Sequence, residues 1–204
     1  ENTRIPVIKH YKGVCHLYVD GEADLEMARR IAVSSKCGRP GVCNAIENLV
    51  VDEKIAAEFL PACAKELVEK GCELLVDEKA GAILGDFPTK PATDDDYHEE
   101  FLDLRLGVKV VESLDDAIAF VNRFGSGHSE SIITANKEHA DRFLREVDAS
   151  SVYWNASTRF TDGFEFGLGA EIGISTDRLH ARGPMGLEEL CTYKYQILGD
   201  GQWK

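Results

Sequence analysis

The chain has 204 residues, of which 44% are hydrophobic and 29% charged, an ordinary balance for a globular protein that is long enough to bury one sizeable core. Its formal net charge of -13 argues against a surface that binds nucleic acid or an anionic membrane, because phosphate groups require a cationic face. No signal peptide and no apolar run of membrane-spanning length is recognisable, so we expect a cytoplasmic protein.

Short apolar runs alternate with longer stretches of helical periodicity along most of the chain. The runs that predict strands are residues 14–19, 46–51, 72–76, 106–111, 131–134 and 151–154. The stretches that predict helices are residues 24–35, 55–70, 114–124 and 137–147. This alternation predicts an α/β fold in which helices cover a layered sheet.

Local signals refine this outline. Ser113, with an acid three residues later at Asp116, predicts the start of the helix 114–124. Pro61 predicts a kink or a break in the helix 55–70. Residues 86–99 contain two prolines and three consecutive aspartates, which indicate a surface connection.

The last fifty residues have a different character. After Trp154 the periodicity stops until residues 187–190, although the stretch is glycine-rich and neither repetitive nor highly charged. Such a long, ordered-looking loop usually shapes a site. Residues 191–198 then alternate as an extended segment, which predicts an edge strand that pairs with another chain in a homo-oligomer.

Six cysteines are spread through the sequence, at positions 15, 37, 43, 63, 72 and 191. A chain of this length does not need disulfides for stability, so we expect the thiols to be reduced. There is no Cys-x-x-Cys pair and no histidine at metal-ligand spacing from a cysteine. The sequence therefore predicts no metal site.

Cys43 is the candidate nucleophile. It follows Arg39-Pro40-Gly41, between the end of a predicted helix and the start of a predicted strand. Glycine and proline favour a turn that can expose the thiol, and Arg39 or a helix N-terminus could lower its pKa. The alternative is that Cys43 is a small buried hydrophobic residue, as expected for the other five cysteines.

His128 lies between a predicted helix and a predicted strand, in residues 125–130. It could act as a general base for Cys43, or it could be a residue that orders the turn. Sequence spacing does not decide between these interpretations.

Three motifs occur in the order found in one enzyme family: RPGVCNA (residues 39–45), GHSESI (127–132) and NASTRFTDG (155–163). With FGLGAEIGIST (166–176) and LHARGPMGL (179–187), they resemble the C-terminal half of the gamma-glutamyl phosphate reductase, or glutamate-5-semialdehyde dehydrogenase, family. The resemblance covers essentially the whole chain. It implies an aldehyde dehydrogenase-like catalytic fold and a cytoplasmic oxidoreductase of proline biosynthesis that uses NADPH.

By this resemblance, Cys43 is the nucleophile that attacks L-glutamyl 5-phosphate, releases phosphate and forms a thioester. Hydride from NADPH then reduces the thioester to L-glutamate 5-semialdehyde, and the Cys43 backbone N–H stabilises the oxyanion. Glu100 matches a superfamily glutamate that holds the nicotinamide ribose. Its alternative is a surface acid that follows an acidic loop.

The motif of residues 155–163 matches the loop that anchors the far end of the substrate in related enzymes. The implied substrate-binding residues are Asn155, Ser157, Thr158 and Arg159. The Arg159 guanidinium suits the carboxylate of an amino acid. Its alternative is a salt bridge to Asp162 or Glu165.

Two departures from the superfamily pattern matter. Hydrolytic members use a glutamate base upstream of the nucleophile, at a position that falls near Ile8 and Lys9, and no acid lies between Glu1 and Asp20. This fits a reductase that must not hydrolyse its thioester.

The second departure is that no strand-Gly-x-Gly-x-x-Gly-helix fingerprint is present. We therefore expect the N-terminal dinucleotide-binding half to be absent from this chain and NADPH to be bound mainly by that half. Residues 1–190 would form the catalytic domain and residues 191–204 a terminal strand for oligomerisation. Two other functions stay open: the catalytic domain of a general aldehyde dehydrogenase, and a non-catalytic oligomerisation or scaffold domain.

Overall fold

Seven parallel strands form the central sheet in the described part of the chain, in the spatial order β4-β3-β5-β2-β1-β6-β7. The computed structural model describes residues 4–5, 7–178 and 181–204. The strands are β1 (Cys15–Val19), β2 (Ile46–Asp52), β3 (Glu73–Val76), β4 (Thr89–Pro91), β5 (Arg105–Val111), β6 (Ser129–Ile133) and β7 (Ser151–Trp154). The predicted α/β architecture is confirmed.

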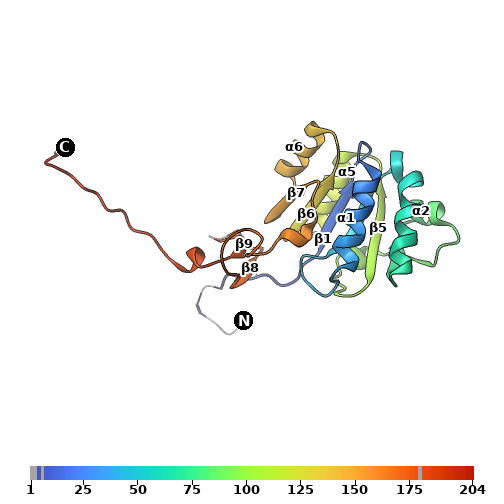
Figure 1. Ribbon diagram of the computed structural model, residues 1–204, viewed down its shortest axis with the longest axis horizontal. Coiled ribbons are helices and arrows are strands. Elements are labelled where there is room, and N and C mark those ends of the chain that lie inside the picture. The colour runs from blue at the N-terminus through green and yellow to red at the C-terminus, as the bar shows by residue number, and fades with distance from the viewer. Residues whose placement is uncertain (1–3, 6, 179–180) are drawn as a thin grey trace.

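Helices cover both faces of this sheet (Figure 1). They are α1 (Leu25–Cys37), α2 (Glu53–Glu69), α3 (Glu78–Leu84), α4 (Asp94–Tyr97), α5 (Leu114–Phe124) and α6 (Lys137–Glu146). None of the described helices is both long and apolar enough to cross a membrane.

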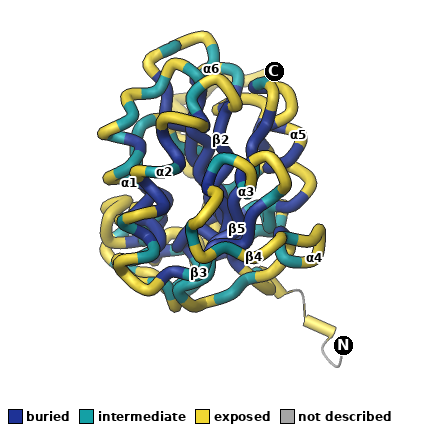
Figure 2. Tube along the Cα trace, turned by 90° about the vertical axis from the view of Figure 1, so that its right-hand side faces the viewer, coloured by how far each residue is buried: buried dark blue, intermediate teal, exposed yellow. Residues whose placement is uncertain are grey.

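Two hydrophobic cores flank the sheet because successive strand residues point to opposite faces. Leu17 and Leu49 join the core beneath α1, α2 and α3. Tyr18 and Val50, one position further along the same strands, join the core beneath α5 and α6. Figure 2 shows the resulting buried sheet between helices whose outer surfaces are exposed. Strands buried on both faces read as continuous apolar runs, which is why the sequence reveals them.

The helix signals were mostly reliable. Helix α5 begins and ends as predicted: the Ser113 side chain accepts a hydrogen bond from the Asp116 N–H at 3.2 Å and donates one to its carboxylate at 2.8 Å. The break considered at Pro61 does not occur, because α2 is continuous through it. Ala57, whose carbonyl would bond to residue 61, lies on the exposed side of α2, where water can bind that carbonyl.

The predicted surface connection of residues 86–99 holds two short elements that the sequence did not reveal. Strand β4 extends the sheet edge by pairing with β3, and the one-turn helix α4 begins with a capping box between Thr93 and Asp96. Neither element is long enough to show the hydrophobic periodicity of a strand or a helix in the sequence. Helix α3, which precedes the connection, was also missed.

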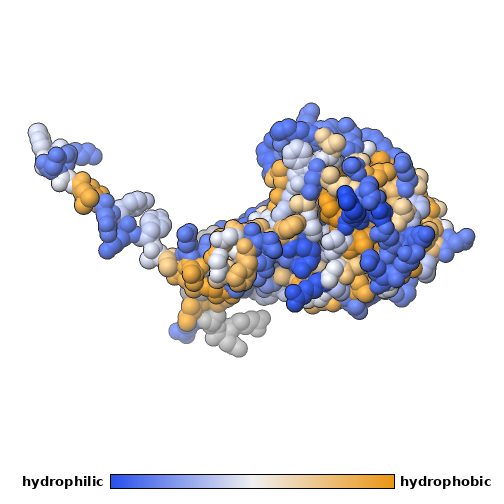
Figure 3. Space-filling view, viewed as in Figure 1, coloured by the Kyte–Doolittle hydropathy of each residue, from blue (hydrophilic) through white to orange (hydrophobic). Residues whose placement is uncertain are grey.

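The chain leaves the sheet after β7. It forms a one-turn 3-10 helix (Thr158–Phe160), a hairpin of β8 (Gly173–Ser175) and β9 (Gly183–Met185), and a second 3-10 turn (Glu188–Leu190). Residues 191–204 are exposed and run away from the body (Figure 1). Apolar surface gathers over the hairpin and the base of this tail, where Ile172, Leu187 and Leu190 are exposed (Figure 3). Pairing of the tail with another chain stays a prediction.

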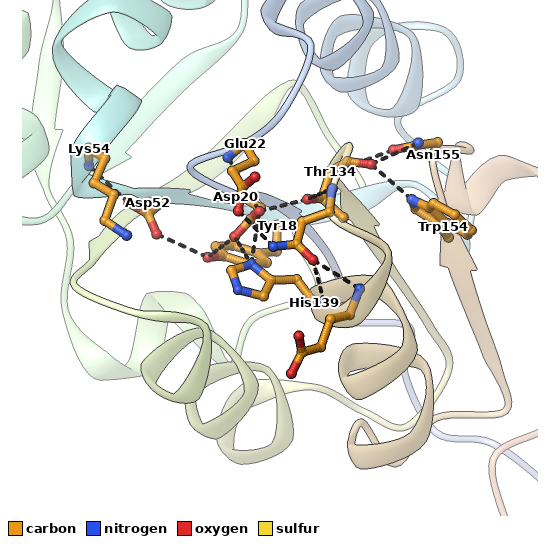
Figure 4. A network of polar contacts seen from close by, with 11 residues as sticks. Tyr18, Asp20, Glu22, Asp52, Lys54, Thr134, His139, Trp154 and Asn155 are labelled. Carbon is orange, nitrogen blue, oxygen red and sulfur yellow. Dashed lines mark hydrogen bonds and ion pairs between the residues drawn. The ribbon is translucent and has the colours of Figure 1, made fainter.

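A polar network closes the carboxyl ends of the central strands (Figure 4). Asp20, which follows β1, accepts hydrogen bonds from Thr134 Oγ1 at 2.6 Å and Tyr18 Oη at 3.2 Å and contacts His139 Nδ1 at 3.0 Å. Tyr18 Oη also lies 3.3 Å from an Asp52 carboxylate oxygen. The buried groups of Tyr18, Asp20 and Thr134 and the half-exposed His139 thus contact one another, and the network ties the ends of these strands together.

Candidate active site

The candidate site lies at the opposite edge, where the amino ends of β5, β2, β1 and β6 are neighbours. In a parallel sheet, the segments that precede adjacent strands lie side by side. Glu100 precedes β5, Cys43 precedes β2, His10 precedes β1 and His128 precedes β6. The fold thereby gathers residues that are far apart in the sequence.

The backbone of Cys43 is tightly confined. It lies in a turn in which the Ala45 N–H donates to the Val42 carbonyl at 3.0 Å, and its side chain is half-buried. The Cys15 thiol donates to the Cys43 carbonyl, with sulfur and oxygen 3.2 Å apart. A Cβ placed on Gly13 would lie only 2.1 Å from that carbonyl oxygen, so only glycine allows this approach. The predicted exposing turn is present, and the fold holds it rigidly.

Residues 155–161, here called the clamp loop, secure the Cys43 turn from the other side. The amide of Asn44 donates to the Thr161 carbonyl at 2.9 Å and to the Arg159 carbonyl at 3.3 Å. Thr158 Oγ1 donates to the Asn44 carbonyl at 2.7 Å. Sequence reasoning missed Asn44, although its position beside the cysteine was the available signal. Thr158 therefore helps to hold the Cys43 turn in place.

Two other predicted substrate-binding residues use their side chains within the protein. Both amide atoms of Asn155, which has φ of 55°, bond to the Thr134 backbone at 2.9 and 3.0 Å. Ser157 Oγ lies 2.6 Å from Ser35 Oγ, and both serines are buried. These contacts order the clamp loop. A direct role in binding substrate stays a prediction for both residues.

Arg159 has a different environment. Its guanidinium bonds to the Asn44 side-chain oxygen, and no described carboxylate lies within ion-pair distance, so the alternative of a salt bridge to Asp162 or Glu165 is not observed. Burial and the nearby Arg39 guanidinium lower the pKa of Arg159. Arg39 likewise forms no ion pair with a described residue. Two neighbouring cations without carboxylate partners are suited to hold an anion.

The charge around Cys43 corrects the expected activation of its thiol. Burial, then the carboxylates of Glu100 and Glu171, raise the pKa of Cys43, while its own backbone N–H and Arg159 act in the opposite direction. The thiolate is thus not favoured in the isolated chain, and Arg39 does not supply the expected depression. Glu171, from the glycine-rich tail, was not predicted to lie near the thiol.

The thiol with a lowered pKa is Cys37, at the end of α1. A hydrogen bond with the Cys72 thiol, together with the charges of Lys70 and Lys36, lowers the pKa of Cys37 to about 7. The sequence had assigned Cys37 only to the end of a helix. We therefore expect Cys37, and not Cys43, to be the more ionised of the two thiols at neutral pH.

A buried ion pair fixes the segment that carries Glu100. Lys36 Nζ and a Glu47 carboxylate oxygen lie 2.5 Å apart, and both side chains are fully buried. The other Glu47 oxygen accepts a hydrogen bond from the Leu102 N–H at 3.3 Å, where φ is 52°. Burial raises the pKa of Glu47 to about 7, against the effect of Lys36. Glu100, two residues before Leu102, is thereby held near Cys43.

His128 lies near Cys43, which is the arrangement that a general base would require. The imidazole of His10 lies there as well, and the sequence did not predict this. One ring nitrogen of His128, one of His10 and the Cys43 sulfur all lie within 4.8 Å of one another. Burial and the neighbouring His10 lower the pKa of His128 to about 4, so its ring is neutral near pH 7. Its Nδ1 lies 2.8 Å from Ser129 Oγ, an orienting contact. A role as general base stays a prediction.

The geometry agrees with comparisons to known proteins. The aldehyde dehydrogenase family model matches residues 106–194. A gamma-glutamyl phosphate reductase from Aquifex aeolicus is 58% identical over 99% of this chain and 48% of its own length. The crystal structure of a gamma-glutamyl phosphate reductase from Thermotoga maritima superposes with a TM-score of 0.94 at 50% identity, covering 100% of this chain and 49% of the other. The enzyme of that name from Saccharomyces cerevisiae is 31% identical, with a TM-score of 0.61 over 98% of this chain and 44% of its own.

These findings confirm the resemblance inferred from the motifs and the aldehyde dehydrogenase-like fold. The chain spans about half the length of the curated relatives it matches. Leu179 and His180, which belong to the tail motif, lie outside the described residues.

Proposed function

We propose that this chain, with its aldehyde dehydrogenase-like fold, is the thiol-bearing half of an enzyme that reduces L-glutamyl 5-phosphate to L-glutamate 5-semialdehyde with NADPH in the cytoplasmic synthesis of proline. One observation carries the proposal: the confined Cys43 thiol lies near the guanidinium of Arg159, and neither Arg159 nor the neighbouring Arg39 has an ion-pair partner among the described residues. The similarity to gamma-glutamyl phosphate reductases over nearly the whole chain supports this reading.

In the first step, the Cys43 sulfur attacks the acyl carbon of L-glutamyl 5-phosphate. The carbon–oxygen bond to phosphate breaks, phosphate departs with the bonding electron pair, and a thioester remains on Cys43. His128, which is neutral and has a ring nitrogen within 4.8 Å of the sulfur, accepts the thiol proton. The Cys43 backbone N–H, which already acts on its own sulfur, is placed to stabilise the oxyanion. Arg159 and Arg39 bind the anionic groups of the substrate.

NADPH, when bound, would supply the hydride that reduces the thioester carbon to the aldehyde, while the carbon–sulfur bond breaks and the Cys43 thiolate leaves. The half of the enzyme outside this chain would hold most of the nucleotide. In this chain, Glu100 fits the nicotinamide ribose, because its carboxylate is half-exposed, accepts hydrogen bonds from hydroxyls and lies near enough to the thiol to raise the pKa of Cys43. Asn44 and Thr158 keep the thiol in place throughout, and Asn155 and Ser157 support the clamp loop and through it the substrate.

A general aldehyde dehydrogenase is the main alternative, and the fate of the thioester discriminates the two. The acid-free segment near Ile8 and Lys9 favours capture by phosphate over hydrolysis, because it offers no base for water. The proximity of Glu100 and Glu171 to the thiol means that this segment is not the sole source of carboxylates. The reaction with and without phosphate must therefore be measured directly.

The test is NADP-dependent oxidation of L-glutamate 5-semialdehyde by the full-length enzyme that contains this segment. NADPH should form rapidly only when phosphate is present, and Cys43→Ser should remove nearly all activity. Cys191→Ser, which alters an exposed thiol in the tail, is the matched control and should stay active. Rapid phosphate-independent formation of glutamate would refute the proposal in favour of a hydrolytic enzyme. An active Cys43→Ser variant would show that Cys43 is not the nucleophile.

A further inference from the structure

We propose that Cys43, His10 and His128 form a binding site for a single zinc ion. We call these three residues the thiol–imidazole cluster. Their ligand atoms lie within 4.8 Å of one another, and the imidazole rings meet edge to face with centroids 5.7 Å apart. The sequence predicted no metal site because it considered only residue spacing along the chain, whereas the parallel sheet brings these three segments together.

The hydrogen bonds of the two histidines engage Nδ1 and leave Nε2 available to a ligand. His10 Nδ1 lies 3.0 Å from the Ile174 carbonyl oxygen, which can only accept, so Nδ1 carries the proton and Nε2 has a free lone pair. His128 Nδ1 contacts Ser129 Oγ, and its Nε2 is buried without a hydrogen-bond partner among the described residues. Imidazole ligands of metals are typically held in this way through the second ring nitrogen.

The buried Nε2 of His128 is an independent indication of a ligand. His128 is fully buried, and buried polar atoms in proteins are nearly always paired. An aromatic contact with His10 does not satisfy a nitrogen lone pair. A cation between the two rings and the thiolate would satisfy it, and the half-exposed positions of His10 and Cys43 leave a route of entry.

The donor set selects the class of metal. One thiolate and two imidazoles suit zinc, whereas magnesium and calcium prefer oxygen ligands. Bond lengths of roughly 2.0 Å to nitrogen and 2.3 Å to sulfur place tetrahedral ligands roughly 3.3 to 3.5 Å apart. The ligand atoms now lie within 4.8 Å of one another, so any pair that is further apart than this must approach on binding. Three protein ligands leave the fourth position of zinc to water or an anion.

A second cluster of possible ligands consists of Asp20, Glu22 and His139, at the carboxyl edge of the sheet (Figure 4). There, both Asp20 oxygens already accept hydrogen bonds, one of them from Thr134. His139 Nδ1 is directed at Asp20 itself. That cluster is internally satisfied, which is why the thiol–imidazole cluster is the better site.

Zinc on Cys43 would hold the sulfur as a coordinated thiolate and prevent its attack on an acyl group. The site itself requires only the three side chains. Its inhibitory effect rests on the proposed function. A cell could thereby keep the nucleophile protected from oxidation in a form that a chelator or a competing zinc protein reverses.

The experiment uses cobalt(II) as a spectroscopic probe on the full chain, because a cobalt–thiolate bond gives a charge-transfer band. We expect one cobalt per chain, with a band that zinc abolishes by displacement. Cys43→Ser should remove the band, and His10→Gln and His128→Gln should each weaken binding by roughly tenfold or more. Cys191→Ser and His139→Gln are matched controls that should bind like the unmodified chain. Circular dichroism establishes whether each variant is folded. If His128→Gln does not fold, the His10→Gln variant provides the test of the imidazole ligands, because His10 is half-exposed.

Absence of the band in the unmodified chain, or its persistence in Cys43→Ser, would overturn the zinc site. Loss of binding in His139→Gln would move the ion to the other edge of the sheet and also overturn it. The two proposals fail separately. Cobalt binding without phosphate-dependent turnover refutes the proposed function alone, and turnover without cobalt binding refutes the zinc site alone.

Discussion

Replacement of Gly13 by alanine should displace Cys43, the proposed nucleophile, by pressing on its backbone while leaving its thiol unaltered. The alanine Cβ would lie 2.1 Å from the Cys43 carbonyl oxygen, 2.8 Å from its carbonyl carbon and 2.9 Å from its Cα. Ordinary contact begins near 3.4 Å, so the Cys43 backbone or the segment before β1 has to shift by about 1.3 Å. The φ of Gly13 lies outside the left-handed region, so the backbone tolerates alanine and the effect is steric.

The size of the effect follows from this displacement. Misplacement of a reacting group by an ångström can cost about a hundredfold in rate, and forcing a methyl group into a packed interior costs typically 1 to 3 kcal/mol of stability. We therefore expect Gly13→Ala to lower kcat by about a hundredfold. Folding should persist, because Gly13 lies outside the sheet strands.

Gly41→Ala is the matched control. Gly41 lies in the same turn, two residues from Cys43, but its Cβ would make only an ordinary contact of 3.6 Å with the Leu102 carbonyl oxygen. The assay is phosphate-dependent NADPH formation by the full-length enzyme, together with urea unfolding of both variants. If Gly13→Ala and Gly41→Ala turn over equally fast, the confinement of Cys43 is not required for catalysis and the reasoning is wrong.

The remaining predictions concern charge. At pH 7, iodoacetamide should label Cys37 before Cys43 in the isolated chain, because the pKa of Cys37 is about 7 and that of Cys43 is raised; peptide mapping that finds the reverse order would contradict this assignment. Arg159→Ala should raise KM for the semialdehyde by roughly 10- to 100-fold, because it removes a charge-assisted contact worth roughly 1.5 to 3 kcal/mol. An unchanged KM would show that Arg159 does not bind substrate and has only a structural role. Burial raises the pKa of Glu47 from 4.5 to about 7, so the folded chain keeps a proton that the unfolded chain loses. The stability contributed by Glu47 is therefore greatest below pH 4.5 and falls as the pH rises to about 7, a slope that Glu47→Gln should remove in urea unfolding.

The fold could be predicted where its signals are local. The strand around Leu49 and Val50 is apolar on both faces, and α5 carries its own cap at Ser113, so both were found from the sequence. The three-residue strands β4, β8 and β9 carry no period, and their pairing partners are set by tertiary contacts. The continuity of α2 through Pro61 depends on which side of the helix faces solvent, which a local rule about proline does not include.

The site shows the same division between local and long-range information. Cys43 was predicted because glycine and proline beside it mark a turn, whereas His10 and Glu171 have no local signal that connects them to a thiol. Their placement depends on the order of strands in the sheet. The pKa of Cys43 was mispredicted for the same reason, because the carboxylates that raise it come from distant segments.

Strand order also explains which edge of the sheet carries chemistry. Glu100, Cys43, His10 and His128 each lie one to five residues before a strand, and β5, β2, β1 and β6 are adjacent, so the four side chains gather at the amino edge. The carboxyl edge gathers its own acids and a histidine, but there each polar group has a partner within the network. At the amino edge, the buried Nε2 of His128 has no hydrogen-bond partner among the described residues, and Arg159 and Arg39 have no ion-pair partner there. Because an unpaired buried polar atom costs free energy, the Nε2 of His128 indicates a ligand, and this is the physical ground for proposing that function lies at the amino edge.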